Sequence, residues 1–264
     1  MLRRLVPLVG IQFILATLII LNGAVPQAPL SPSSYFNPPY AYAWLNTLFL
    51  LPAGAAVAYI SSKAFLTGGR ISVQLMGCGI LALCSATLGT WAGTSAQAIG
   101  FYYIVLNLFG ILFGAVFLLA GVLIARRDVV IPPGKRLAPL VATYVGLAAA
   151  GGLVWLGAAE GWVPSFFESK PTTLSVEVLI GAAILFSVAS AVLGWNYLSA
   201  RSEILYWYEI GVLLVLTSIL TYVFIRHPGD PISWLYRCTT FLYGGAFLNA
   251  VLNSQGDEEP KADR

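Results

Sequence analysis

Residues 201–253 read RSEILYWYEIGVLLVLTSILTYVFIRHPGDPISWLYRCTTFLYGGAFLNAVLN and contain two apolar runs of helical length. The runs cover Ile204–Ile225 and Ile232–Asn253, and the turn His227–Pro231 joins them. At 1.5 Å per residue, about 20 helical residues cross a hydrocarbon core of about 30 Å. This stretch therefore predicts a pair of antiparallel transmembrane helices.

The composition of the whole chain indicates the same class of protein. Of the 264 residues, 58% are hydrophobic and 9% are charged, and the mean hydropathy is +0.83. Soluble domains carry about 25% charged residues. A chain this apolar cannot cover itself with polar surface in water, so we expect the lipid bilayer to be its solvent. The net charge of +3 reports orientation in the membrane and does not indicate nucleic-acid binding.

Apolar runs of similar length recur along the chain and predict an all-α integral membrane protein, a bundle of eight transmembrane helices. The expected spans are Leu5–Val25, Ala41–Ser62, Ser72–Ala92, Phe101–Ala125, Ala138–Ala159, Leu174–Leu198, Ile204–Ile225 and Ile232–Asn253. Residues 1–253 would form one membrane domain, and residues 254–264 a short charged cytoplasmic tail. The first span is too long for the apolar part of a signal peptide, so we expect it to be retained.

Lysine and arginine are distributed unequally between the two sets of connecting segments. One set holds Arg3, Arg4, Lys63, Arg70, Arg126, Arg127, Lys135, Arg136, Arg201, Lys261 and Arg264, and the opposite set holds only Lys170 and Arg226. Basic residues prefer the cytoplasmic side of a membrane. Both termini are therefore predicted to be cytoplasmic, in a multi-pass protein of the cytoplasmic (inner) membrane.

Glycines in several spans are expected to let helices pack closely. The fourth span contains Gly110 and Gly114 in a G-x-x-x-G pattern, with Gly121 seven residues further on. These three residues fall on one helical face, where the backbone of a neighbouring helix can approach. We predict the same role for the glycines of the fifth and eighth spans, Gly146, Gly151, Gly152, Gly244 and Gly245.

Ionisable and amide side chains inside the spans are the candidate ligand or signal residues, because such groups are costly in hydrocarbon. They are Glu177, Glu209, Arg237 and Asn107, together with Trp234 in the eighth span. The alternative is that these groups only fix helix packing through hydrogen bonds, or that Arg237 extends to the lipid headgroups. We expect Glu177 and Arg237 to pair near the external face. Glu209 and Arg237 should differ in depth by about 14 Å, too far for an ion pair.

No catalytic, metal or cofactor motif is evident in the sequence. The single histidine, His227, argues against a haem held by two histidines, and the placement of every lysine outside the spans argues against a retinal protein. A HExxH zinc motif is absent, and all aspartates lie outside the spans, so neither a zinc protease nor an intramembrane aspartyl protease is predicted. We therefore expect a protein that is not an enzyme and that needs no metal or cofactor.

Five stretches resemble a known family. They are AYISSKAFLTGG and LMGCGILAL in spans two and three, VPSFFESKPTT before span six, EILYWYEIG opening span seven, and DPISWLYRCTTFLYGGAFLNAV in span eight. In this order they resemble the N-terminal multi-helix membrane sensor module of archaeal and bacterial PAS-containing sensor histidine kinases. The resemblance covers residues 40–253 and includes no catalytic motif. One departure is Leu106, which precedes Asn107 where several relatives carry a histidine.

The resemblance implies a non-catalytic signal-input module of a two-component system. Such a module relays a cue to a cytoplasmic output partner, such as a histidine kinase or a PAS-type domain. The natural relay is the eighth span, which leads into the tail and holds Arg237. The tail is too short for a kinase core or a PAS fold, so we expect a free-standing input module or the input part of a longer sensor.

Other partners and another function also follow from the sequence. The expected partners are the lipid bilayer and a second copy of the chain in a homodimer. The alternative function is a small-molecule transporter or channel, which would need a polar path at mid-depth and broken helices. An integral membrane enzyme would need clustered His, Asp or Cys at one depth, and no such cluster is visible.

Overall fold

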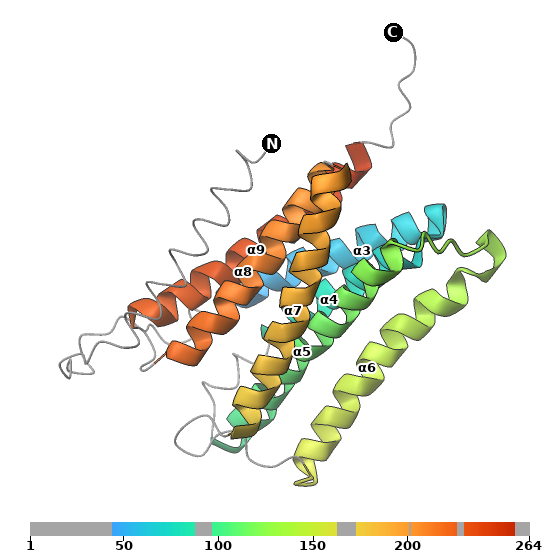
Figure 1. Cartoon of the computed structure of the whole chain (residues 1–264). Coiled ribbons are helices and arrows are strands. Elements are labelled where there is room, and N and C mark those ends of the chain that lie inside the picture. Colours follow the sequence, from blue (N-terminus) through green and yellow to red (C-terminus); the bar gives the residue numbers. More distant parts are fainter. Residues whose placement is uncertain (1–43, 88–96, 163–172, 201, 226–229, 257–264) are drawn as a thin grey trace.

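The computed structural model describes residues 44–87, 97–162, 173–200, 202–225 and 230–256 (Figure 1). These residues form seven α-helices and no β-strand, which confirms the predicted all-α class. The helices are α3 (Leu51–Gly68), α4 (Ile71–Ala86), α5 (Gln97–Ala125), α6 (Leu137–Ala159), α7 (Thr173–Ala200), α8 (Glu203–Phe224) and α9 (Pro231–Gly256). A π-helical turn, η2 (Asn46–Leu50), leads into α3, and a 3-10 turn, η4 (Pro133–Lys135), precedes α6.

Five helical segments are long and apolar enough to cross a membrane, so the chain is a multi-pass membrane protein. They are Asn46–Gly68, Val105–Ala125, Pro133–Ala159, Val176–Ala200 and Glu203–Phe224. Helix α4 is apolar but has only 16 residues, and α9 has 26 residues but is less apolar than the five. The predicted first span, Leu5–Val25, lies outside the described residues, as does the tail after Gly256.

The limits of the helices follow from local sequence. Pro52 follows directly on the π-helical turn and has no amide to bond back to that turn, and Gly69 ends α3 with a left-handed φ of 77°. Helix α9 starts at Pro231, after Asp230, whose carboxylate accepts a hydrogen bond from the Ser233 amide at 2.5 Å. Between such limits the helix satisfies its own backbone groups, which a lipid environment requires.

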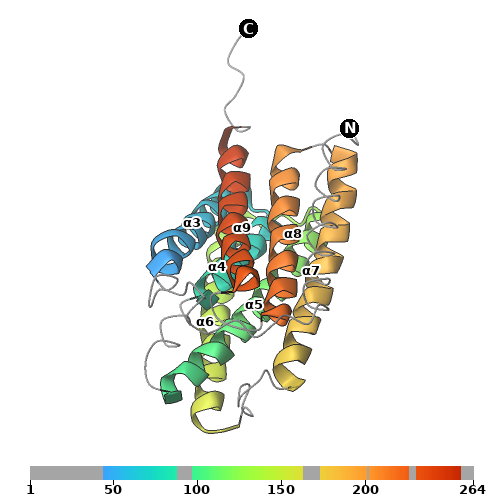
Figure 2. The ribbon, with the colours of Figure 1, turned by 90° about the vertical axis from the view of Figure 1, so that its left-hand side faces the viewer.

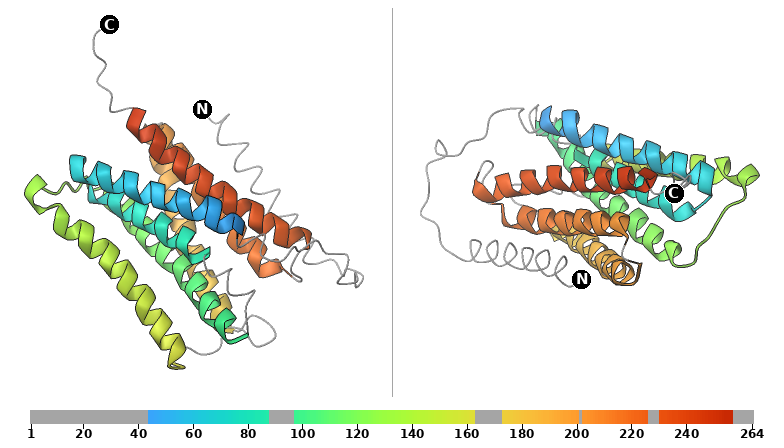
Figure 3. Two further views of the ribbon diagram at one scale, coloured as in Figure 1. Left: turned by 180° about the vertical axis from the view of Figure 1, so that it is seen from behind. Right: turned by 90° about the horizontal axis from the view of Figure 1, so that it is seen from above.

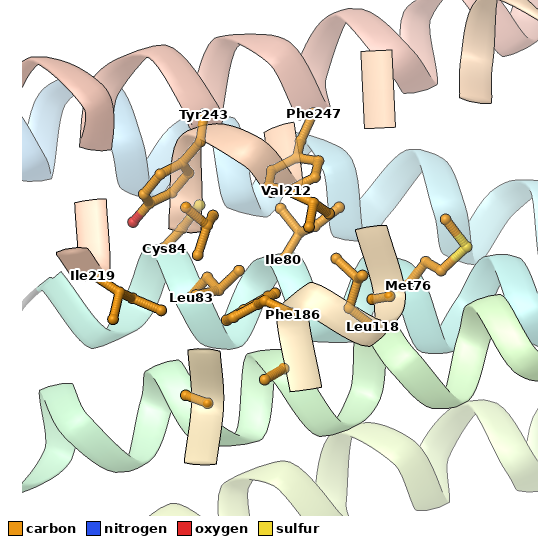
Figure 4. Close-up of a cluster of buried hydrophobic side chains, with 14 of the residues drawn as sticks. Met76, Ile80, Leu83, Cys84, Leu118, Phe186, Val212, Ile219, Tyr243 and Phe247 are labelled. Carbon is orange, nitrogen blue, oxygen red and sulfur yellow. The ribbon is translucent and has the colours of Figure 1, made fainter. Parts of the chain in front are cut away.

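The helices pack into a bundle with α4 and α5 along its middle (Figures 1 and 2). Helix α3 packs on α4, helices α8 and α9 form a hairpin, and α7 joins α5 to α8. The buried core draws on α4, α5, α7, α8 and α9, as Figure 4 shows. Its labelled side chains are Met76, Ile80, Leu83, Cys84, Leu118, Phe186, Val212, Ile219, Tyr243 and Phe247.

Helix α6 lies at the edge of the bundle (Figures 1 and 3). None of residues 137–156 is buried, whereas Gly157 and Ala158 near its end are. Its neighbours are chiefly α5 and α4. The helix therefore touches the bundle much less than its length would allow.

The glycines of α5 hold α4 and α5 together, which confirms the prediction from the G-x-x-x-G pattern. A Cβ atom added to Gly110, Gly114 or Gly121 would collide with side chains of α4. From the opposite side, a Cβ at Gly79 of α4 would lie 2.9 Å from the Gly114 carbonyl oxygen and from the Leu118 amide nitrogen. Only glycine permits backbones to approach this closely.

The same prediction is wrong for α6 and right for only one glycine of α9. No atom lies within 4 Å of a Cβ built at Gly146, Gly151 or Gly152, because α6 leans away from the bundle. In α9, Gly244 packs against η2, while Gly245 faces open space. A glycine pattern thus marks close packing only where a partner helix is present.

The α3–α4 and α5–α6 connections meet at one end of the bundle. The Ile131 amide donates a 2.8 Å hydrogen bond to the Gly69 carbonyl. The Arg136 guanidinium donates to two carbonyls in the last turn of α3, at 2.6 Å each, and to the Ile131 carbonyl at 2.8 Å. One arginine thereby caps a helix and fixes a second loop to it.

We call this end, comprising residues 63–70 and 126–136, the basic end. It carries Lys63, Arg70, Arg126, Arg127, Lys135 and Arg136, and one acid, Asp128, which pairs with Arg70 at 3.4 Å. Because the two connections touch, they share one side of the membrane. The predicted topology places both on the same side.

Gly69→Ala is expected to lower the free energy of unfolding by more than about 1 kcal/mol, because a left-handed backbone costs an ordinary residue roughly 1–2 kcal/mol. The new Cβ would also lie 2.5 Å from the Ile131 carbonyl oxygen. Gly68→Ala is the matched control, since no atom lies within 4 Å of a Cβ there. Unfolding in mild detergent measures both variants, and equal stabilities would contradict the role of Gly69.

Candidate functional site

Most of the buried polar side chains among the described residues lie in α8 and α9. They are Glu209, Thr217, Ser218 and Thr221 in α8, Ser233, Arg237, Thr239 and Thr240 in α9, and Asp230 directly before α9. Polar groups at membrane depth turn toward other helices and mark functional positions more often than polar groups elsewhere. The hairpin of α8 and α9 is therefore the candidate site.

Glu209 is a buried carboxyl group at the contact of α7 and α8. Its side chain is 6% exposed, and its Oε1 accepts a 2.6 Å hydrogen bond from the Ser190 hydroxyl of α7. Its Oε2 has no hydrogen-bond partner among the described residues. Gly194, one turn after Ser190, faces the same carboxyl, and a Cβ there would lie 3.8 Å from Oε1. Helix α7 thus has a glycine beside a carboxyl group of which only one oxygen has a hydrogen-bond partner among the described residues.

A second group of polar side chains, which we call the polar seam, joins α5, α8 and α9. It consists of Asn107, Ser218, Tyr222, Tyr236 and Thr240. The Ser218 and Thr240 hydroxyls are 3.1 Å apart, and Thr240 donates to the Tyr236 carbonyl at 2.8 Å, so Ser218 is the donor between the two hydroxyls. The rings of Tyr222 and Tyr236 lie 5.5 Å apart at 56°.

The polar seam encloses a small cavity. Its volume is about 10 Å³, and Asn107, Ser218, Tyr222 and Tyr236 lie in its lining beside apolar residues of α5, α7 and α8. This volume is close to the smallest space, about 10–15 Å³, that holds a single water molecule. A space of about the size of one water molecule therefore lies among the side chains of the seam.

Arg237 and Trp234 form a contact one turn apart in α9. Arg237 is 7% exposed, and its guanidinium carbon lies 4.7 Å from the centroid of the Trp234 ring. This distance is within the range of a cation–π interaction. The guanidinium is thus buried against the indole, and does not extend out of the bundle.

The predicted ion pair between Glu177 and Arg237 is not formed among the described residues. Glu177 is exposed on α7, whereas Leu179, two residues later, is buried in the core. Successive helical residues are rotated by about 100°, so these two side chains point to nearly opposite faces. The sequence indicates the depth of Glu177 and not its rotation. Glu209 does not pair with Arg237 either, because its carboxyl group turns toward α7.

Two of the five candidate residues, Trp234 and Arg237, contact each other, and Asn107 lies near the same end of α9. Asn107 lines the cavity with Tyr236, which precedes Arg237 in sequence, and Arg237 contacts Trp234. Glu209 stands apart, nine residues or about 14 Å along α8 from Ser218. Glu177 belongs to neither group.

The sequence does not single out the uncharged members of these contacts, Ser190, Ser218, Tyr222, Tyr236 and Thr240. Serine, threonine and tyrosine are common in membrane helices, so no single one stands out. The only available signal was the clustering of hydroxyl residues in two consecutive spans. Gln74 of α4 is not singled out either, although it is fully buried and neither amide atom has a hydrogen-bond partner among the described residues.

Neither a metal site among the described residues nor a similar known protein indicates the function. No group of three or more His, Cys, Asp or Glu side chains in the described parts of the chain could hold a metal ion. The chain matches no protein-family model, no curated protein and no solved structure. Function is therefore inferred from the geometry of α8 and α9.

Ser190→Ala is expected to lower the free energy of unfolding by roughly 1–2 kcal/mol, because it leaves the Glu209 carboxyl buried without a partner. Ser187→Ala is the control on the same helix, since the Ser187 hydroxyl is exposed and bonds only to the Ala183 carbonyl. In a Glu209→Leu background, Ser190→Ala should be nearly neutral. A loss of the same size in both backgrounds would show that the two side chains are not coupled.

Proposed function

We propose that the chain is a membrane-embedded signal-input module, itself non-catalytic, that relays a cue to a cytoplasmic output partner such as a histidine kinase or a PAS-type domain. In this proposal the chain crosses the cytoplasmic membrane eight times, and both termini are cytoplasmic. The charge excess of the basic end supports this orientation. The observation that carries the functional proposal is the polar seam between α8 and α9.

A relay requires an element with two arrangements of similar free energy. Hydrogen bonds between membrane helices average about 0.6 kcal/mol each, so exchanging their partners costs little. Ser218 and Thr240 form such a bond, and Ser218 also lines the cavity of about 10 Å³, into which its hydroxyl can turn. The α8–α9 contact can therefore shift without unfolding either helix.

Helix α9 provides the path for such a shift. It begins after Asp230, passes Trp234 and Arg237 within its first two turns, and continues to Gly256. Arg237 and Gly256 are 19 residues apart, which corresponds to about 28 Å of helix. A cue that changes the contacts of Arg237 at one end would move the other end of the same rigid helix.

The alternative, a small-molecule transporter or channel, would need a polar path through the bundle. The cavity at the polar seam is about the size of one water molecule, so it gives no specific observation in favour of solute transport.

The proposal is tested with a chimaera in which the chain is followed in frame by a histidine kinase core and is expressed in bacterial membranes. Thr240→Val removes the hydroxyl and keeps the shape of the side chain. Loss of one bond of about 0.6 kcal/mol should change autophosphorylation roughly threefold, in either direction. Ser187→Ala, at an exposed site on α7, should leave it unchanged.

A disulfide between cysteines placed at Ser218 and Thr240 gives the converse test. It should fix autophosphorylation at one level, and reduction should restore the original level. Unchanged activity in both the Thr240→Val and the cross-linked chimaera would contradict a relay through this contact. Solute uptake by the purified chain in liposomes would favour the transporter instead.

A further inference from the structure

A cleft of about 550 Å³ separates α6 from α4 and α5. Its lining includes Ala82 and Ser85 of α4, Gly110 and Phe113 of α5, and Ala148 and Gly151 of α6. Two hydroxyl groups, those of Ser85 and Tyr144, interrupt an otherwise apolar lining. The Ser85 hydroxyl donates to the Ala82 carbonyl at 3.1 Å, so it already has a partner. The cleft therefore suits hydrocarbon better than a polar solute.

Two contacts along α6 attach this helix to the bundle on either side of the cleft. Toward the basic end, the hydroxyls of Tyr144 and Ser62 are hydrogen-bonded at 2.7 Å, which ties α6 to α3. Near the other end, Gly157 and Ala158 are buried. Between these contacts the small residues of α6 do not reach α4 or α5, as the open space around Gly151 shows. The gap is thus built into the packing of the helices.

We propose that the cleft binds an acyl chain of an anionic phospholipid from the surrounding bilayer. The cleft lies between α6 and α5, two helices that are long and apolar enough to cross the membrane, so its mouth faces lipid hydrocarbon. Water does not fill an apolar space, because it finds too few hydrogen-bond partners there. A volume of about 550 Å³ falls in the usual range of roughly 300–1,000 Å³ for small-molecule pockets.

The basic end supplies the complement to an anionic headgroup. Lys63 follows Ser62, which bonds to Tyr144 of the cleft lining, and Lys135 precedes α6; both side chains are exposed. Tyr144 lies seven residues, or about 10 Å, above the first residue of α6. A phospholipid whose acyl chain lies in the cleft would therefore have its phosphate near the level of these lysines, where basic residues attract anionic lipid. This site shares no residue with the polar seam and goes beyond the proposed relay.

Native mass spectrometry of the full chain in detergent, titrated with phosphatidylglycerol and with phosphatidylcholine, tests the proposal. The wild-type chain should retain phosphatidylglycerol with higher affinity. Gly151→Phe fills the cleft and should weaken this binding by roughly tenfold or more, and Gly151→Leu should do so to a smaller extent. Gly152→Phe is the matched control, since the neighbouring glycine is exposed and equally uncrowded. It should bind as the wild type does.

Lys63→Gln combined with Lys135→Gln should remove the preference for phosphatidylglycerol and leave phosphatidylcholine binding unchanged. Equal affinity of the wild type for the two lipids would overturn the headgroup assignment. Wild-type affinity in both Gly151 variants would overturn the cleft assignment.

A second measurement uses the wild-type chain and does not depend on the folding of any variant. Phosphatidylglycerol with a photoreactive diazirine in its acyl chain is cross-linked to the protein, and the adducts are mapped by peptide mass spectrometry. Adducts concentrated on the cleft-lining residues of α4, α5 and α6 are expected. Adducts spread evenly over the exposed faces of the other helices would show ordinary lipid contact and overturn the proposal.

Discussion

The close approach of α4 and α5 at Gly79 and Gly114 is the contact on which the rest of the bundle depends. Lipid tails are as apolar as leucine, so no hydrophobic force drives helices together inside a membrane. Close packing must supply the attraction, and it requires residues without bulky side chains. Helix α4 has such residues on two faces: Gly79 admits α5, and Gly77 admits Ser61 of α3. The core of Figure 4 forms around the pair that these glycines bring together.

Helix α9 shows how the bundle accommodates polar side chains. Its exposed residues, among those with described side chains, are Pro231, Cys238, Leu242, Gly245 and Leu252. All five are apolar, and their spacings of three, four and seven place them on one face. Arg237, Thr239 and Thr240 are buried on the other side. An average over the whole helix mixes the two faces, which explains why α9 is less apolar overall than the other long helices while its outer face suits lipid.

The sequence predicts the positions of the helices along the chain well, because a hydrocarbon solvent demands long apolar runs. It predicts the neighbours of each helix less well. Gly110 and Gly151 look alike in sequence, yet one contacts α4 and the other faces the cleft. Glu177 lies near the start of α7, as expected, but on its exposed face. The role of Arg136 as a cap on α3 depends on two loops meeting, and no local pattern shows this.

The candidate site, too, can be predicted only in part from the sequence. Glu209 and Arg237 can be identified from the sequence, because charges inside apolar runs are rare. The partner of Glu209 cannot, because Ser190 lies on another helix and becomes its neighbour only when α7 and α8 pack. The contact of Arg237 with Trp234 needs only the helix, since the two residues are three positions apart. Hydroxyl side chains also lack a distinguishing signal in a chain this rich in small residues.

The lipid exposure of α9 is tested most directly at Cys238, because this native cysteine lies on the exposed face while Cys78 and Cys84 are buried. A nitroxide attached to Cys238 in liposomes reports its surroundings through collisions with oxygen, which enters hydrocarbon, and with a nickel chelate, which stays in water. If α9 crosses the bilayer with its polar side chains inward, oxygen collisions will dominate. Nickel collisions that exceed those of oxygen would contradict the account.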